Sequence, residues 1–117
     1  MQHRDLVVVF EDDPHLRPLL ERWLGEAGYS VTPQFPDGDT RPVLVIADVR
    51  DPQGADVPIR ALQEYRVAIL VMSARFRRGL AGSAETARRL GVQAVLPKPF
   101  TRAELLTAVR DAIAGTE

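Results

Sequence analysis

The sequence of 117 residues contains no cysteine, which excludes disulfide bonds and thiolate chemistry. A bound metal would therefore have to use oxygen ligands. No apolar stretch reaches the length that spans a bilayer, and the apolar run that follows Met1–Asp5 is too short for a secretory signal. We therefore expect a cytoplasmic protein without a membrane segment.

An excess of positive charge is also missing, since the formal net charge is −1 and Lys98 is the only lysine. General attraction to nucleic acid depends on clustered lysine and arginine side chains that neutralise phosphates. Direct nucleic-acid binding by this chain is therefore not expected. The length suits one domain, which we place at residues 1–117, and 45% hydrophobic residues are ordinary for a globular fold.

The sequence does contain four short apolar runs that each end at a residue with useful chemistry. The runs and the residues that follow them are Leu6–Phe10 with Glu11 and Asp12, Val43–Ala47 with Asp48, Ala68–Met72 with Ser73, and Ala94–Pro97 with Lys98. If the runs are parallel strands, their carboxyl ends meet at one edge of the sheet, where ligands bind in open α/β folds. We therefore expect these side chains to form one site.

Helical patterns alternate with the apolar runs and predict an α/β protein. The expected helices extend from Asp13 and Pro14 to Gly28, over Asp56–Tyr65, from a cap at Ser83 to Gly91, and from a capping box at Thr101–Glu104 to Ile113. Tyr29–Thr32 is expected to be a short strand, whereas prolines at 33, 36 and 42 predict a loop before the next strand. Turn residues predict a turn at 51–54, and the segment Ala74–Gly82 is expected to be a loop. Five parallel strands in the flavodoxin-like order 2-1-3-4-5 follow from this alternation.

The expected site combines three carboxylates with one hydroxyl and one ammonium. Gathering carboxylates costs Coulomb energy, which a hard divalent ion such as Mg²⁺ relieves while it shares its coordination with phosphate oxygens. Asp48 stands alone at its strand end, so it is the candidate nucleophile for an aspartyl phosphate. Lys98 and Ser73 would then offset or hydrogen-bond the phosphoryl oxygens.

These motifs resemble the receiver domain of response regulators in two-component signalling. The stretches that carry the resemblance are EDDPHLRPLL at 11–20, VLVIAD at 43–48, ILVMSA at 69–74 and VLPKPF at 95–100. The resemblance implies a CheY-like fold and a phosphoacceptor, Asp48, with Ser73 and Lys98 at the phosphoryl group. It also implies a cis Lys98–Pro99 peptide and a Mg²⁺ ion held by Glu11, Asp12, Asp48 and the backbone carbonyl of Arg50.

The resemblance further implies partners and an activity. A histidine kinase, a phosphotransfer protein or a small phosphodonor would supply the phosphoryl group, and a downstream protein would respond to it. A homodimer is compatible with this function. The chain would not be an enzyme beyond its own phosphorylation and dephosphorylation.

The chain departs from the family pattern at several places. A loop replaces the usual second helix, so one face of the sheet is expected to be bare or covered by a partner, and Val95 stands where many receivers have a switch aromatic. These departures keep open the alternative of a degenerate receiver that acts as a phosphorylation-independent interaction module. Arg50 and Arg75 flank the expected site, and we hypothesise that they tune loss of the phosphoryl group. A phosphohydrolase is less favoured, because Arg50 stands where its second acid is expected.

Overall fold

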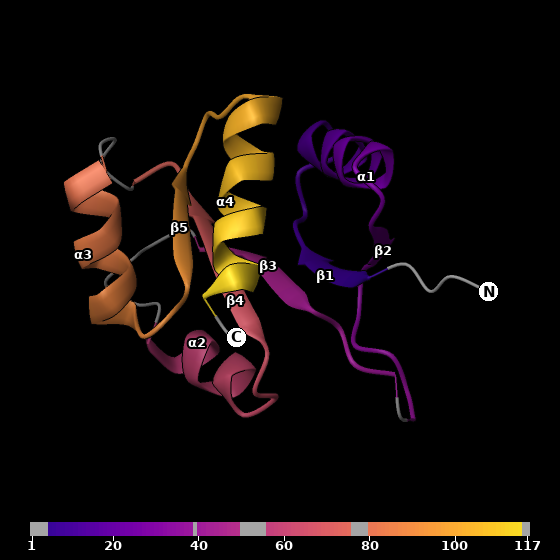
Figure 1. Cartoon of the computed structure of the whole chain (residues 1–117), viewed down its shortest axis with the longest axis horizontal. Coiled ribbons are helices and arrows are strands. Elements are labelled where there is room, and N and C mark those ends of the chain that lie inside the picture. The colour runs from indigo at the N-terminus through magenta and orange to yellow at the C-terminus, as the bar shows by residue number, and fades with distance from the viewer. Residues whose placement is uncertain (1–4, 39, 50–55, 76–79, 116–117) are drawn as a thin grey trace.

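A parallel five-stranded sheet with helices on both faces forms the protein (Figure 1). The computed structural model describes residues 5–38, 40–49, 56–75 and 80–115. The strands are β1 (Leu6–Phe10), β2 (Ser30–Thr32), β3 (Leu44–Asp48), β4 (Ala68–Ser73) and β5 (Ala94–Pro97). Their order is β2-β1-β3-β4-β5, so the expected flavodoxin-like topology is confirmed.

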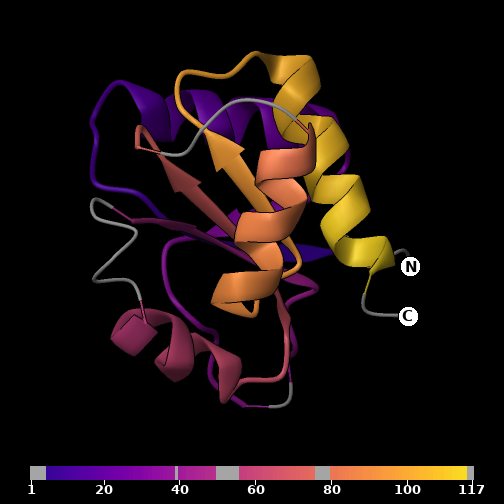
Figure 2. The same ribbon diagram turned by 90° about the vertical axis from the view of Figure 1, so that its left-hand side faces the viewer.

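One face of the sheet is covered by α1 (Leu16–Glu26) and α4 (Arg102–Ala114), which lie close together in both views (Figures 1 and 2). Apolar residues at helical spacing point inward from both helices, and the fully buried ones are Leu20, Leu24, Leu105, Val109 and Ala112. No helix in the described part of the chain is long and apolar enough to cross a membrane.

The ends of these two helices follow from local sequence. Asp13 caps the start of α1, because its carboxylate accepts hydrogen bonds from the backbone N–H groups of His15 at 2.7 Å and Leu16 at 3.3 Å. Gly28 ends the helix with a φ of 98°, which a residue with a side chain rarely adopts. At the start of α4, Thr101 and Glu104 form the expected reciprocal capping box.

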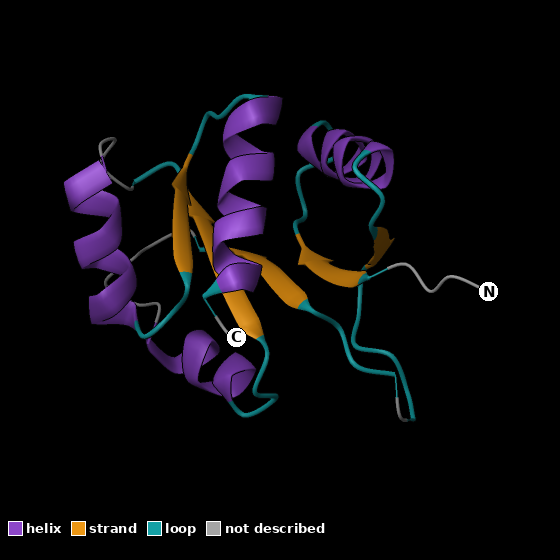
Figure 3. Cartoon of the chain, in the orientation of Figure 1, coloured by secondary structure: helices purple, strands orange, loops and turns teal. Residues whose placement is uncertain are grey.

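The opposite face carries α2 (Asp56–Gln63) and α3 (Leu80–Leu90), and Figure 3 shows the helices on either side of the strands. The prediction of a loop to Gly82 with a cap at Ser83 is wrong, since α3 already begins at Leu80. A glycine inside a helix costs only about 1 kcal/mol, and the burial of Ala87 and Leu90 against the sheet offsets that cost. The turn predicted at 51–54 lies outside the described residues.

No helix lies between β2 and β3 in the described residues 33–38 and 40–43, as the prolines predicted. An aromatic stack takes its place. The ring of Phe35 stacks on Tyr65 at a centroid distance of 3.7 Å and tilts against Phe10 at 5.9 Å. Val8 and Val45 on this side of the sheet have no exposed surface, so the prediction of a bare or partner-covered face is wrong at its centre. Phe10 and Phe35 are half-buried and Tyr65 is 54% exposed, so the stack lies at the surface of the protein next to the end of β1.

Candidate functional site

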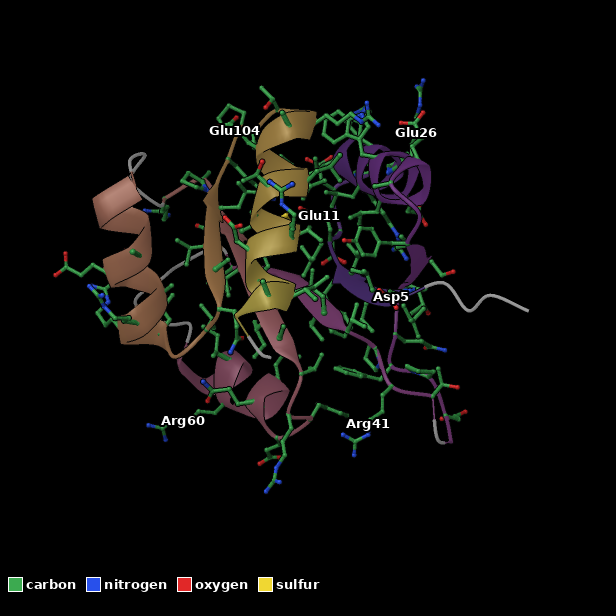
Figure 4. The ribbon with its side chains drawn as sticks, in the orientation of Figure 1. Asp5, Glu11, Glu26, Arg41, Arg60 and Glu104 are labelled. Carbon is green, nitrogen blue, oxygen red and sulfur yellow. The ribbon has the colours of Figure 1, made fainter. Side chains whose placement is uncertain are left out.

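The carboxyl ends of β1, β3 and β5 meet at one ammonium group. Lys98 Nζ lies 2.6 Å from Glu11 Oε1 and 2.7 Å from Asp48 Oδ1. The parallel register explains the meeting, because Asp48 aligns with Met72 of β4, whose next residue, Ser73, aligns with Pro97 of β5. In Figure 4, Glu11 lies toward the same end of the molecule as Glu26 and Glu104, opposite Arg41 and Arg60.

The two carboxylates favour the charged form of Lys98. Burial lowers the pKa of Lys98, but hydrogen bonds and charge from Asp48 and Glu11 outweigh burial, so its pKa is raised above the ordinary value. Glu11 is buried and its second oxygen accepts a hydrogen bond from the backbone N–H of Asp13 at 3.2 Å. The site therefore holds a protonated lysine between two negative side chains.

Ser73 is fully buried at the end of β4, and its hydroxyl oxygen accepts a hydrogen bond from the backbone N–H of Arg75 at 3.1 Å. The backbone N–H of Lys98 donates to the carbonyl oxygen of Ser73 at 3.0 Å, which fixes the turn after β5 beside β4. The Lys98–Pro99 peptide is cis, as the resemblance implied. The side chain of Arg75 is exposed.

Asp12 is exposed but lines the same cleft as Glu11 and Asp48. The cleft has a volume of about 450 Å³. The other lining residues are Val9, Phe10, Arg17 and Pro33. The structure thus brings Glu11, Asp48 and Lys98 into contact and places Asp12 on the same cleft, whereas Arg50 lies outside the described residues.

The carboxylates on this cleft suit Mg²⁺ in kind, because it prefers hard oxygen ligands and takes only one or two carboxylates with waters. Within the described residues, however, no group of three or more acidic, histidine or cysteine side chains converges closely enough to hold a metal ion. Glu11 and Asp48 instead contact Lys98. The carboxylate oxygens of the cleft are suitable ligands for Mg²⁺. In this structure the ammonium of Lys98 supplies the positive charge beside Glu11 and Asp48.

Sequence reasoning missed Arg17, which reaches the cleft from the first turn of α1. The spacing in the sequence could have indicated it, since Arg17 follows the capping residue Asp13 by four positions. In the structure the backbone N–H of Arg17 donates to the carbonyl oxygen of Asp13 at 3.0 Å. A residue one turn into a helix that starts at a strand end lies beside that end.

Known proteins resemble this chain in fold and, in part, in sequence. No family model matches the chain. Over 117 residues it is 32% identical to the transcriptional regulatory protein PdtaR of Mycobacterium tuberculosis, an alignment that covers 92% of this chain and 56% of that protein. The chain thus spans about half the length of the curated relatives it matches.

Solved structures agree with this relationship. A response regulator receiver protein from Burkholderia phymatum is 26% identical, with a TM-score of 0.70 and coverage of 95% of this chain and 96% of that one. The receiver domain of a sensor histidine kinase from Pseudomonas aeruginosa PAO1, with a magnesium ion coordinated in its active site cleft, is 28% identical. Its TM-score is 0.67, with coverage of 96% of this chain and 99% of that one. The chain belongs to the response-regulator receiver domains of two-component signalling.

Proposed function

We propose that this receiver domain, taken as residues 1–117, accepts a phosphoryl group on Asp48 from a histidine kinase, a phosphotransfer protein or a small phosphodonor. The observation that carries the proposal is the position of Lys98 Nζ, 2.7 Å from the carboxylate of Asp48 and 2.6 Å from that of Glu11. A fixed cation beside the nucleophile offsets the charge of an entering phosphoryl group.

Each site residue has a proposed role. Asp48 provides the attacking oxygen, and Lys98 contacts the phosphoryl oxygens as a compact point charge. The hydroxyl oxygen of Ser73 accepts a hydrogen bond from the backbone N–H of Arg75, which leaves the hydroxyl hydrogen to donate to the phosphoryl group.

Mg²⁺ is the proposed cofactor. Glu11, Asp12, Asp48 and the backbone carbonyl of Arg50 would hold the ion, which supplies positive charge opposite the phosphoryl oxygens. The related Pseudomonas receiver coordinates magnesium in its active site cleft, which supports this assignment. A downstream protein that reads the phosphorylated surface completes the proposed function, and the domain is a phosphoacceptor rather than an enzyme with an external substrate.

Incubation with acetyl phosphate and MgCl₂, followed by intact mass measurement, tests the proposal. We expect one phosphoryl adduct on the wild type and none on Asp48→Asn. Asp111→Asn is a matched control, because Asp111 is an exposed carboxylate on α4, and it should form the adduct like the wild type. Omitting Mg²⁺ should slow adduct formation.

A phosphorylation-independent interaction module is the second candidate. Val95 is buried at 7% exposure, where the resemblance to other receivers places a switch aromatic, and this observation favours the alternative. An unmodified wild type after prolonged incubation with donor and Mg²⁺ would support the module and refute phosphorylation of Asp48.

A further inference from the structure

Arg17 is a cation on the wall of an otherwise acidic cleft. It is half-buried and lines the cleft with Asp12, Glu11 and Asp48. Within residues 5–38, 40–49, 56–75 and 80–115, its guanidinium has no ion-pair or hydrogen-bond partner. Lys98, by contrast, is already engaged by two carboxylates. Within the described residues, Arg17 is therefore a cleft cation whose guanidinium hydrogen-bond donors are all unoccupied and can bind an entering anion.

Resting on the function proposed above, we propose that Arg17 recognises the leaving group of the phosphodonor and so selects which donors Asp48 accepts. The side chain of Asp48 is only 22% exposed, contacts Lys98 and lines the cleft. In phosphoryl transfer the attacking and leaving oxygens lie roughly in line on opposite sides of phosphorus. The leaving group therefore points away from Asp48 toward the open cleft, whose wall includes Arg17.

The chemistry of the leaving group decides whether Arg17 can bind it. With acetyl phosphate, a bond forms between an Asp48 oxygen and phosphorus while the bond from phosphorus to the acetate oxygen breaks. Acetate departs with that electron pair, and its planar carboxylate matches the donor fork of a guanidinium. With phosphoramidate, the phosphorus–nitrogen bond breaks and the protonated nitrogen leaves as ammonia, which offers the guanidinium no oxygen acceptor. Arg17 should therefore favour acyl phosphates over phosphoramidate.

Second-order rate constants of adduct formation, measured by intact mass with each donor in the presence of Mg²⁺, test the inference. We expect Arg17→Ala to lower the rate with acetyl phosphate by about tenfold, as for one charge-assisted hydrogen bond at a partly exposed site. The rate with phosphoramidate should not change. Arg17→Lys should restore part of the loss, because it keeps the charge without the planar fork.

Arg22→Ala is the matched control, because Arg22 lies on the same helix and, among the residues that the structure describes, pairs only with Glu26, at 3.6 Å. It should leave both rates unchanged. An equal loss with both donors would overturn the inference, since it would indicate a general structural or electrostatic role, and so would unchanged rates in Arg17→Ala. If the wild type forms no adduct with either donor, the proposed function fails instead, so the two failures are distinguishable.

Discussion

Replacing Lys98 by methionine should destabilise the protein by about 2–3 kcal/mol at neutral pH. The substitution keeps much of the aliphatic stem but removes the ammonium that contacts both Glu11 and Asp48. Breaking a buried ion pair by removing one partner costs roughly 3–5 kcal/mol, because a charge stays buried without compensation. The Lys98 and Asp48 side chains keep 19% and 22% of their surface exposed, so solvent screening places the expected loss at the lower end or just below.

The same contact predicts how stability depends on pH. Burial lowers the pKa of Lys98, but the hydrogen bonds and charges of Asp48 and Glu11 raise it by more, so the net shift is upward from 10.5. A raised pKa means that the stabilisation is fully present below pH 10.5 and is lost as the pH rises through the higher folded-state value. The difference between wild type and Lys98→Met should therefore stay constant near neutral pH and shrink in strong alkali.

Urea unfolding followed by circular dichroism measures the difference, and thermal unfolding should show a midpoint lower by roughly 10 °C. Arg110→Met is the matched control, since Arg110 is an exposed cation on α4, and it should change the unfolding free energy by less than about 0.5 kcal/mol. Adding Glu11→Gln to Lys98→Met should restore part of the loss, because it removes the uncompensated charge. A Lys98→Met variant as stable as Arg110→Met would refute the reasoning.

Three further predictions address other parts of the molecule. Phe35→Ala should lower the unfolding free energy by about 2 kcal/mol in urea, because it removes the middle ring of the stack, whereas Leu19→Ala, at an exposed position, should cost less than half as much. Backbone N–H groups of the first turn of α1 lower the pKa of Asp13 from 3.8, so its stabilisation is present above pH 3.8 and lost as the pH falls through the lower folded-state value. Thermal unfolding across the acid range should show this loss in the wild type and not in Asp13→Ala, with Asp13→Asn retaining most of the cap at neutral pH. If Arg75 slows attack by water, Arg75→Ala should shorten the half-life of the phosphorylated domain, and equal half-lives would exclude that role.

The strand order and the strand ends could be predicted because they follow from local patterns. Short β-branched runs flanked by helical spacing dictate a parallel sheet, and parallel strands present their carboxyl ends at one edge. The capping box at Thr101 and the left-handed Gly28 also follow from a few neighbouring residues. The meeting of Glu11, Asp48 and Lys98 required only this topology, although the sequence does not show that one ammonium contacts both carboxylates.

The aromatic stack could not be predicted, because Phe35 and Tyr65 are thirty residues apart and belong to a loop and to the turn after α2. Rules for turns explain why residues 33–38 and 40–42 avoid a helix, but they do not predict that Val8 and Val45 are nevertheless fully buried. The start of α3 was misplaced for a related reason. Gly82 is a local signal against a helix, and packing of the later residues of α3 against the sheet overrides it.

Lys98 can stabilise the unmodified site and still bind an entering phosphoryl group. An ammonium has three hydrogens to donate, and within the described residues two of them are directed at Glu11 and Asp48. The third hydrogen is left to donate to an entering phosphoryl oxygen. The acyl phosphate replaces the −1 charge of the Asp48 carboxylate by about −1.5 to −2 charges on the phosphoryl group, so the ammonium exchanges one negative partner for a more negative one. Lys98 therefore stabilises the unmodified fold through the two carboxylates, and the same ammonium is in place to stabilise the phosphorylated one through Glu11 and the phosphoryl oxygens.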